Sequence, residues 1–296
     1  MADKTFAKRW QELADARGPL CVGVDPHPQL LRAWGLRDDV ESLRRFCRTM
    51  VAALAGHVAI IKPQSAFFER YGSAGIAVLE ETIADIRSTG TLVIMDAKRG
   101  DIGSTMRAYS HAYLHPDSPL CVDALTLSPY LGVDANTAAY ELAGEYGRGL
   151  FLLALTSNPE GRAIQQAQLQ DGRTVAQSII DEAAVKNIGA APCGDVGVVV
   201  GATVSDCKDS TGAHDSTAHD LSALIGPILV PGMGEQGGQP QDLPRVLGPA
   251  TQLAIPIYAR EIARQGPNEG EILAVAKATN DACRKIINTH AKRGET

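Results

Sequence analysis

The sequence has no closely spaced cysteine pair, no excess of basic residues and no long apolar segment. Its six cysteines are scattered without a CxxC pair, so we expect buried, reduced thiols rather than a zinc site or a redox motif. The net charge of −6 argues against non-specific nucleic-acid binding, which requires a basic surface. No apolar run reaches the length of a membrane span, and the charged N-terminal residues contain no signal core. We therefore expect a cytoplasmic protein that binds neither nucleic acid nor membrane.

Short apolar runs rich in Val, Ile and Leu alternate with longer segments of helical periodicity, as parallel strands buried on both faces require. The candidate strands are 20–25, 58–63, 91–98, 121–128, 149–157, 196–203, 226–232 and 251–260. Strands alternating with helices in this number predict an α/β fold of the (β/α)8 TIM-barrel type. A doubly wound sheet is less favoured because no GxGxxG motif follows the first strand.

The remaining segments predict how the barrel is completed. A helix that covers the barrel is indicated near the N-terminus by the spacing of Phe6, Trp10 and Leu13. Residues 158–195 are long for one βα unit, with a helix starting near Thr174, and the polar residues 204–221 predict a loop with a short helix. No repeat or linker separates a second domain, so we expect residues 1–296 to form a single barrel domain.

Charged residues lie at or just beyond the C-terminal ends of the first three predicted strands, where a barrel of this type carries its active site. They are Asp25, Lys62, Asp96, Lys98 and Asp101. Asp96 and Lys98 are two residues apart, so an extended chain would place both on one face. Flanking carboxylates favour the charged ammonium of Lys98, which prepares it to donate a proton. A structural ion-pair network explains any one of these residues equally well, but the set at consecutive strand ends favours catalysis.

The segment from Asp96 to Thr105 resembles the DxKxxD-I-x-x-T signature of the orotidine 5'-phosphate decarboxylases, with Lys98, Asp101 and Ile102 at the matching positions. CVGVDP, IKPQSAFFE, LTSNP and VPGMGEQGG are similar to further landmarks of this family, and together they span most of the chain. The elongated form resembles the longer bacterial (type 2) branch. The resemblance implies decarboxylation of orotidine 5'-monophosphate to uridine 5'-monophosphate in pyrimidine biosynthesis, with no cofactor and no metal.

The resemblance also implies roles for the charged residues. Lys98 would protonate the C6 carbanion that remains when carbon dioxide leaves, and Asp96 would face the substrate carboxylate. Lys62 would link Asp96 to the ribose, and Asp25 would accept a hydrogen bond from a ribose hydroxyl. In this family, the residues that match Asp101, Ile102 and Thr105 enter the partner subunit's site. The resemblance therefore implies a homodimer with shared active sites.

Further substrate contacts are implied after the later strands. Ser157 resembles the serine that bonds the pyrimidine ring, although TSNPEG is equally a turn sequence. Pro231, Gly232 and Gln236 resemble the closing loop that grips base and phosphate, where many barrels bind phosphate on backbone amides.

Arg260 resembles the family's phosphate clamp, for which a guanidinium is well suited. The sequence departs from a common family pattern here, because Ala259 replaces a glycine and Pro256 interrupts the predicted strand. Arg264 is the alternative clamp.

Three alternatives remain at this point. A metal-dependent sugar-phosphate decarboxylase or lyase of the same superfamily shares DxKxxD, but it would need a carboxylate where Lys62 stands. A class I aldolase with Lys98 or Lys62 as Schiff base needs a lowered lysine pKa, which the carboxylates oppose. A non-catalytic pyrimidine-nucleotide sensor would not need a proton donor.

Overall fold

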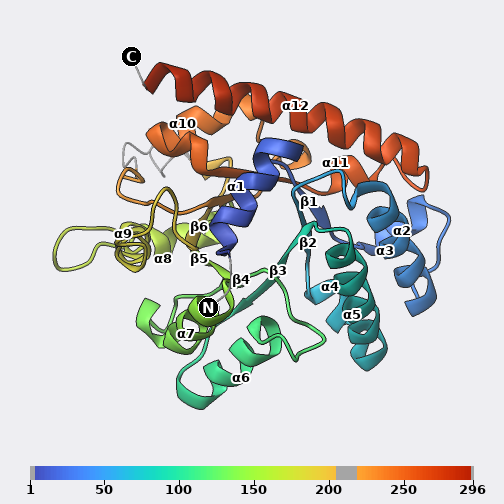
Figure 1. Cartoon of the computed structure of the whole chain (residues 1–296), viewed down its shortest axis with the longest axis horizontal. Helices are drawn as coiled ribbons and strands as arrows, with labels where there is room; N and C mark the ends of the chain where they lie inside the picture. Colours follow the sequence, from blue (N-terminus) through green and yellow to red (C-terminus); the bar gives the residue numbers. More distant parts are fainter. Residues whose placement is uncertain (1–3, 205–218, 295–296) are drawn as a thin grey trace.

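The computed structural model of the chain describes residues 4–204 and 219–294, with side chains up to residue 290. Eight parallel strands pair in chain order and close into a barrel (Figure 1). The strands are β1 (Cys21–Val24), β2 (Ile60–Pro63), β3 (Leu92–Arg99), β4 (Ala124–Leu127), β5 (Gly149–Leu155), β6 (Val196–Val200), β7 (Ile228–Val230) and β8 (Ala254–Tyr258). Each overlaps a predicted strand, and the predicted (β/α)8 fold is confirmed.

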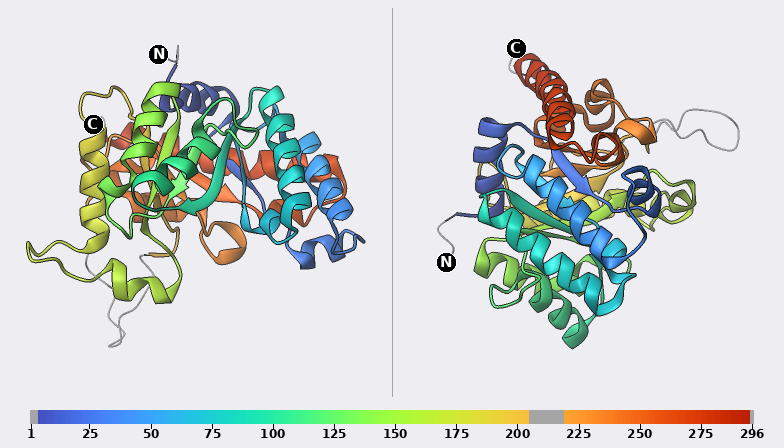
Figure 2. Two further views of the ribbon diagram at one scale, coloured as in Figure 1. Left: turned by 90° about the horizontal axis from the view of Figure 1, so that it is seen from below. Right: turned by 90° about the vertical axis from the view of Figure 1, so that its right-hand side faces the viewer.

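Helices surround this barrel. The α-helices are α1 (Phe6–Arg17), α2 (Pro28–Ala33), α3 (Val40–Leu54), α4 (Ala66–Glu69), α5 (Gly72–Ser88), α6 (Gly103–Leu114), α7 (Thr137–Tyr146), α8 (Arg162–Gln165), α9 (Val175–Lys186), α10 (Leu243–Leu247), α11 (Arg260–Ala263) and α12 (Glu269–Gly294). Short 3-10 helices are η1 (Val133–Asn136), η2 (Pro159–Gly161), η4 (Gly234–Gln236), η5 (Pro240–Asp242) and η6 (Gly248–Leu253). Helix α12 follows the last strand and packs against α3, which completes the outer ring (Figure 2). Among the described helices, none has the length and apolar character of a membrane span.

Local sequence signals explain where several helices begin. The Asp39 carboxylate accepts a 2.8 Å hydrogen bond from the Ser42 amide and so caps α3. Thr174 caps α9 in the same way, through the Gln177 amide, as the sequence predicts. The short helix predicted within 204–221 falls largely on residues 205–218, which lie outside the described part of the chain.

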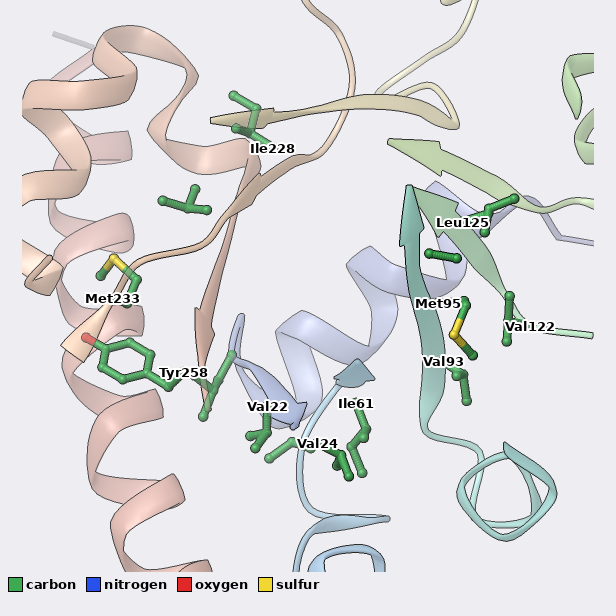
Figure 3. Packing of buried hydrophobic residues seen from close by; sticks show 14 of the residues in the cluster. Val22, Val24, Ile61, Val93, Met95, Val122, Leu125, Ile228, Met233 and Tyr258 are labelled. Carbon is green, nitrogen blue, oxygen red and sulfur yellow. The ribbon is translucent and has the colours of Figure 1, made fainter. Parts of the chain in front are cut away.

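Alternation along the strands divides the buried residues into two layers. Side chains that point outward meet the helices, and Figure 3 shows Val22, Val24 and Ile61 together on this side of β1 and β2. Side chains that point inward, such as Ile60 and Ile94, fill the barrel. Because successive residues face opposite sides, the inward series on β2 and β3 continues toward the C-terminal strand ends, where charged residues begin.

Helix α1 covers the N-terminal end of the barrel (Figure 1), as the sequence predicts. Phe6 and Trp10 are buried, and the Phe6 ring meets Phe151 edge-to-face with 5.9 Å between centroids. A Cβ atom at Gly149 would lie only 2.4 Å from the Phe6 ring, so the first residue of β5 must be glycine for this contact. Helix α1 therefore closes the N-terminal end, and the charged residues lie at the opposite end of the barrel.

We expect Phe6→Ala to destabilise the protein by about 3–5 kcal/mol, because a fully buried ring would leave a cavity under α1. Denaturant unfolding measures the change. Lys8→Ala, on the exposed face of the same helix, should change stability by no more than about 0.5 kcal/mol. Similar small losses in both variants would contradict the covering role of α1.

Candidate active site

A cavity of about 560 Å³ opens at the C-terminal ends of the strands, within the size range of small-molecule sites. Predicted site residues in its lining are Asp25, Lys62, Asp96, Lys98, Pro231, Gly232, Gln236 and Arg260. The structure therefore brings together Asp25, which directly follows β1, with residues from β2, β3, the loop after β7 and the start of α11. The other predicted site residues, Asp101, Ile102, Thr105 and Ser157, are not part of this lining.

The Asp96 carboxylate is the centre of the site because four side chains donate hydrogen bonds to it. Lys62 Nζ lies 2.9 Å and Gln64 Nε2 3.0 Å from Asp96 Oδ2. Lys98 Nζ lies 2.5 Å and Thr126 Oγ1 3.2 Å from Asp96 Oδ1. These contacts join three neighbouring strands and confirm the predicted pairing of Asp96 with both lysines.

The two ammoniums keep this carboxylate ionised. Burial acts to raise the pKa of Asp96, but the charges of Lys62 and Lys98 outweigh burial and hold that pKa well below its usual value. Burial acts to lower the pKa of Lys62, but the charges of Asp96 and Asp25 outweigh burial and raise this pKa. Lys62 is only 4% exposed, yet it stays charged because carboxylates surround it.

Asp25 adds an unpaired acceptor to the cavity wall. Its Oδ1 atom is buried and has no hydrogen-bond partner among the described residues. Burial raises the pKa of Asp25, and the charge of Lys62 opposes that rise. A buried acceptor without a donor costs folding free energy. A ligand hydroxyl at this position would donate the missing hydrogen bond.

A bulge in β3 brings Lys98 to Asp96. Lys98 has φ of +48°, a left-handed conformation that lysine rarely adopts. The register between β3 and β4 shifts between Met95 and Arg99. The prediction that Asp96 and Lys98 share a face is confirmed, but the backbone at Lys98 is not extended as that prediction assumed. Such local strain is typical of functional sites.

Thr126 on β4 holds this bulge. Its Oγ1 accepts hydrogen bonds from the amides of Ala97 (3.1 Å) and Lys98 (2.9 Å), and it also bonds Asp96. One hydroxyl thus fixes both the irregular backbone and the carboxylate.

Arg260 begins α11, directly after β8, and lines the cavity. Pro256 lies inside β8 and pairs with Val230, so it does not end the strand. The Ala259 methyl is accommodated by Gly23, where a Cβ atom would approach it to 2.7 Å. These two departures from the family pattern therefore leave Arg260 at the cavity.

The loop after β7 folds back on itself. The Gly234 amide donates to Gly238 O (2.7 Å), and the Gly238 amide donates to Gly232 O (3.1 Å). Gly232 and Gly234 have positive φ, which glycine adopts without strain. Ser157 lies behind this loop, since a Cβ atom at Gly232 would be 3.7 Å from Ser157 Oγ.

Asp101, Ile102 and Thr105 lie at the beginning of α6. Ile102 is 63% exposed, which is unusual for an isoleucine beside an active site. Asp101 Oδ1 accepts a 2.8 Å hydrogen bond from the Ile102 amide.

Sequence reasoning missed several residues of the site. Gln64 is the second residue after Lys62, and its position in IKPQ was a usable signal. His27, for which the sequence analysis proposed no role, packs its ring against Phe67 with 4.2 Å between centroids, and both residues line the cavity. Burial lowers the pKa of His27, Asp25 acts to raise it, and nearby Arg260 also lowers it.

A parallel barrel with an ionised Asp–Lys array at its open end, and an arginine across the cavity, defines a (β/α)8 enzyme. Its site suits an anionic ligand and contains the Lys98 ammonium, a group able to donate a proton.

Comparison with known proteins narrows this class. Residues 18–275 match the model of the Orotidine 5'-phosphate decarboxylase / HUMPS family. Orotidine 5'-phosphate decarboxylase from Salinispora tropica is 52% identical over 96% of this chain and 99% of its own length. The Streptomyces coelicolor enzyme of the same name is 52% identical over 89% of this chain and 91% of its own. A crystal structure from Streptomyces avermitilis aligns with a TM-score of 0.91 at 50% identity, covering 97% of this chain and 98% of that one. The chain belongs to the orotidine 5'-phosphate decarboxylase / HUMPS family.

We expect Thr126→Val to destabilise the protein by about 1–3 kcal/mol, because it removes the acceptor of the buried Ala97 amide and of the partly buried Lys98 amide. Denaturant unfolding is the measurement. Thr126→Ser retains the hydroxyl and should lose less stability than the valine variant. If valine were tolerated better than serine, packing rather than hydrogen bonding would explain this residue.

Proposed function

We propose that the cavity converts orotidine 5'-monophosphate to uridine 5'-monophosphate and carbon dioxide, without a cofactor and with Lys98 as the proton donor. The observation that carries the proposal is the Asp96 carboxylate held between the ammoniums of Lys62 and Lys98 in the cavity lining. The names of relatives at 52% identity support it. A metal-dependent lyase is less favoured, because Asp96 is bonded to two ammoniums rather than available to a metal ion.

The electrostatics of Asp96 suit the loss of a carboxylate. A substrate carboxylate placed beside Asp96 would meet a second negative charge that cannot be relieved by protonation, because the lysines hold the pKa of Asp96 low. This repulsion disappears as carbon dioxide leaves. The electron pair of the broken carbon–carbon bond remains at C6, where the Lys98 ammonium stabilises it.

Lys98 then completes the reaction. Its proton moves from Nζ to C6, and the electron pair of the carbanion forms the new C–H bond. The neutral amine takes up a proton from water, which is accessible because the Lys98 side chain is 45% exposed. The overall change consumes one proton and releases carbon dioxide.

Other cavity residues would position the nucleotide. The unpaired Asp25 Oδ1 would accept a hydrogen bond from a ribose hydroxyl. Lys62 would contact the ribose while it remains hydrogen-bonded to Asp96. Arg260 and the loop residue Gln236 would bind the phosphate, and Pro231 and Gly232 would lie along the base. Ser157 lies beside Gly232 and would reach the pyrimidine from that side of the loop.

We propose a homodimer in which Asp101, Ile102 and Thr105 enter the partner's site. Exposed apolar residues next to this segment support the proposal. Tyr130 is 76% and Leu131 53% exposed, and their loop touches the segment at Gly100, where a Cβ atom would be 2.4 Å from Ser128 O. Contiguous exposed apolar side chains of this kind are typical of protein interfaces.

We also propose that residues 1–296 form one domain in the cytoplasm. The cysteines within the described residues are buried free thiols, which supports a reducing compartment.

Lys98→Ala should lower kcat by at least about 10²–10⁴-fold, since it removes the general acid, while the protein stays folded. The conversion is followed by the ultraviolet absorbance of the pyrimidine, with a chelator present throughout. Lys277→Ala, an exposed lysine on α12, is the control and should retain full activity. Absence of turnover by folded wild-type protein would favour the nucleotide sensor, and turnover that chelation abolishes would favour a metal enzyme.

The dimer proposal predicts complementation between two inactive variants. Lys98→Ala damages a subunit's own site, whereas Asp101→Ala would damage the partner's site. After mixing and subunit exchange, half of the dimers are hybrids, each with one intact site, so about a quarter of wild-type activity should return. If the mixture remains as inactive as its components, Asp101 acts in its own subunit.

A further inference from the structure

The phosphate end of the cavity is the part beside Arg260, where the nucleotide phosphate is proposed to bind. A carboxylate of the protein already occupies this part. Glu235 Oε1 lies 2.7 Å from Arg264 Nη2 and 3.4 Å from Arg260 Nη1. We infer that Glu235 competes with the 5'-phosphate for Arg260, so that nucleotide binding exchanges a carboxylate for a phosphate on this guanidinium. The inference rests on the proposed function only in taking Arg260 as the phosphate clamp.

The loop fixes where the Glu235 carboxylate can reach. Glu235 occupies the middle of η4 (Gly234–Gln236) and lines the cavity. Just before it, Met233 is buried, and Figure 3 shows its side chain next to Tyr258. With this anchor on one side and the Gly234–Gly238 hydrogen bond on the other, rotation of the glutamate side chain is the simplest way to leave Arg260.

The charges at this end make the competition unavoidable. Arg260 and Arg264 share one carboxylate, so an incoming phosphate would meet the negative charge of Glu235 beside the guanidinium it needs. Half-buried charges at such short range interact more strongly than in bulk water. His27 also lines this cavity, and Glu261 lies close to Gly234. Of the two glutamates, Glu235 and Glu261, only Glu235 is ion-paired to Arg260 within the described part of the chain.

Arg264 determines where the displaced carboxylate goes. Its contact with Glu235 is shorter than that of Arg260, and its side chain is more exposed, 59% compared with 36%. When phosphate takes Arg260, Glu235 can therefore remain on Arg264. In this arrangement Arg264 is a positioning residue that acts through Glu235, rather than a second phosphate clamp.

The same exchange applies to product release. Uridine 5'-monophosphate carries the same phosphate as the substrate, so the return of Glu235 to Arg260 would favour its departure. Glu235 thus lowers the affinity for every ligand that carries the phosphate and leaves ligands without it unaffected.

Calorimetric titration of the purified full chain tests the competition with three probes: uridine 5'-monophosphate, inorganic phosphate and uridine. Glu235→Gln should tighten binding of the first two by about fivefold and leave uridine unchanged. Glu261→Gln removes a neighbouring carboxylate that lies against Gly234, and it should change all three constants less than twofold. Unchanged or weaker phosphate binding in Glu235→Gln, or equal tightening in Glu261→Gln, would overturn the inference.

A second comparison isolates Arg264. Arg264→Gln should weaken binding of uridine 5'-monophosphate more in the wild-type background than in the Glu235→Gln background. Only the wild-type background has a Glu235 carboxylate that Arg264 can hold away from Arg260. Equal losses in both backgrounds would mean that Arg264 contacts the phosphate directly, against the inference. These are binding measurements, so failure of orotidine 5'-monophosphate turnover would overturn the proposed function separately, while inorganic phosphate would still report on Glu235.

Discussion

The rest of the site depends on one electrostatic constraint: the largely buried Asp96 carboxylate must remain ionised. Taking a carboxylate out of water is costly unless opposite charges and hydrogen bonds replace the solvent. Lys62 and Lys98 supply the charges, and Gln64 and Thr126 supply further donors. The left-handed backbone at Lys98 is then understandable, because the bulge it creates places a second ammonium on the same carboxylate.

The two ends of the barrel differ in what they contribute: the N-terminal end stabilises the fold, and the C-terminal end carries the candidate active site. The N-terminal end is closed by Phe6 and Trp10 of α1 and contains well-packed apolar side chains. The C-terminal end carries charged groups, an unpaired Asp25 oxygen and a strained residue, all of which cost folding free energy. Apolar burial at the closed end stabilises the fold and so allows the open end to retain these costly features.

The sequence was sufficient for the barrel because each strand is an apolar run that differs clearly from its flanking helices. It was sufficient for the Asp–Lys array because charges are rare at buried strand ends. It was not sufficient for Thr126, which looks like any strand threonine until the β3 bulge brings two amides to its hydroxyl. Nor could it pair Glu235 with Arg264, since that contact joins segments 29 positions apart through the folded loop.

Binding at the phosphate end and reaction at Asp96 are coupled through the substrate. The repulsion between Asp96 and a substrate carboxylate opposes binding, so it must be offset by favourable contacts elsewhere on the nucleotide. Arg260 is the proposed phosphate contact for that purpose, and it is already ion-paired to Glu235. A stronger phosphate grip would hold substrate and product alike, whereas only the substrate carries the carboxylate that Asp96 repels. On the two proposals above, a moderated grip by Arg260 would still offset the repulsion at Asp96 and would also allow the product to leave.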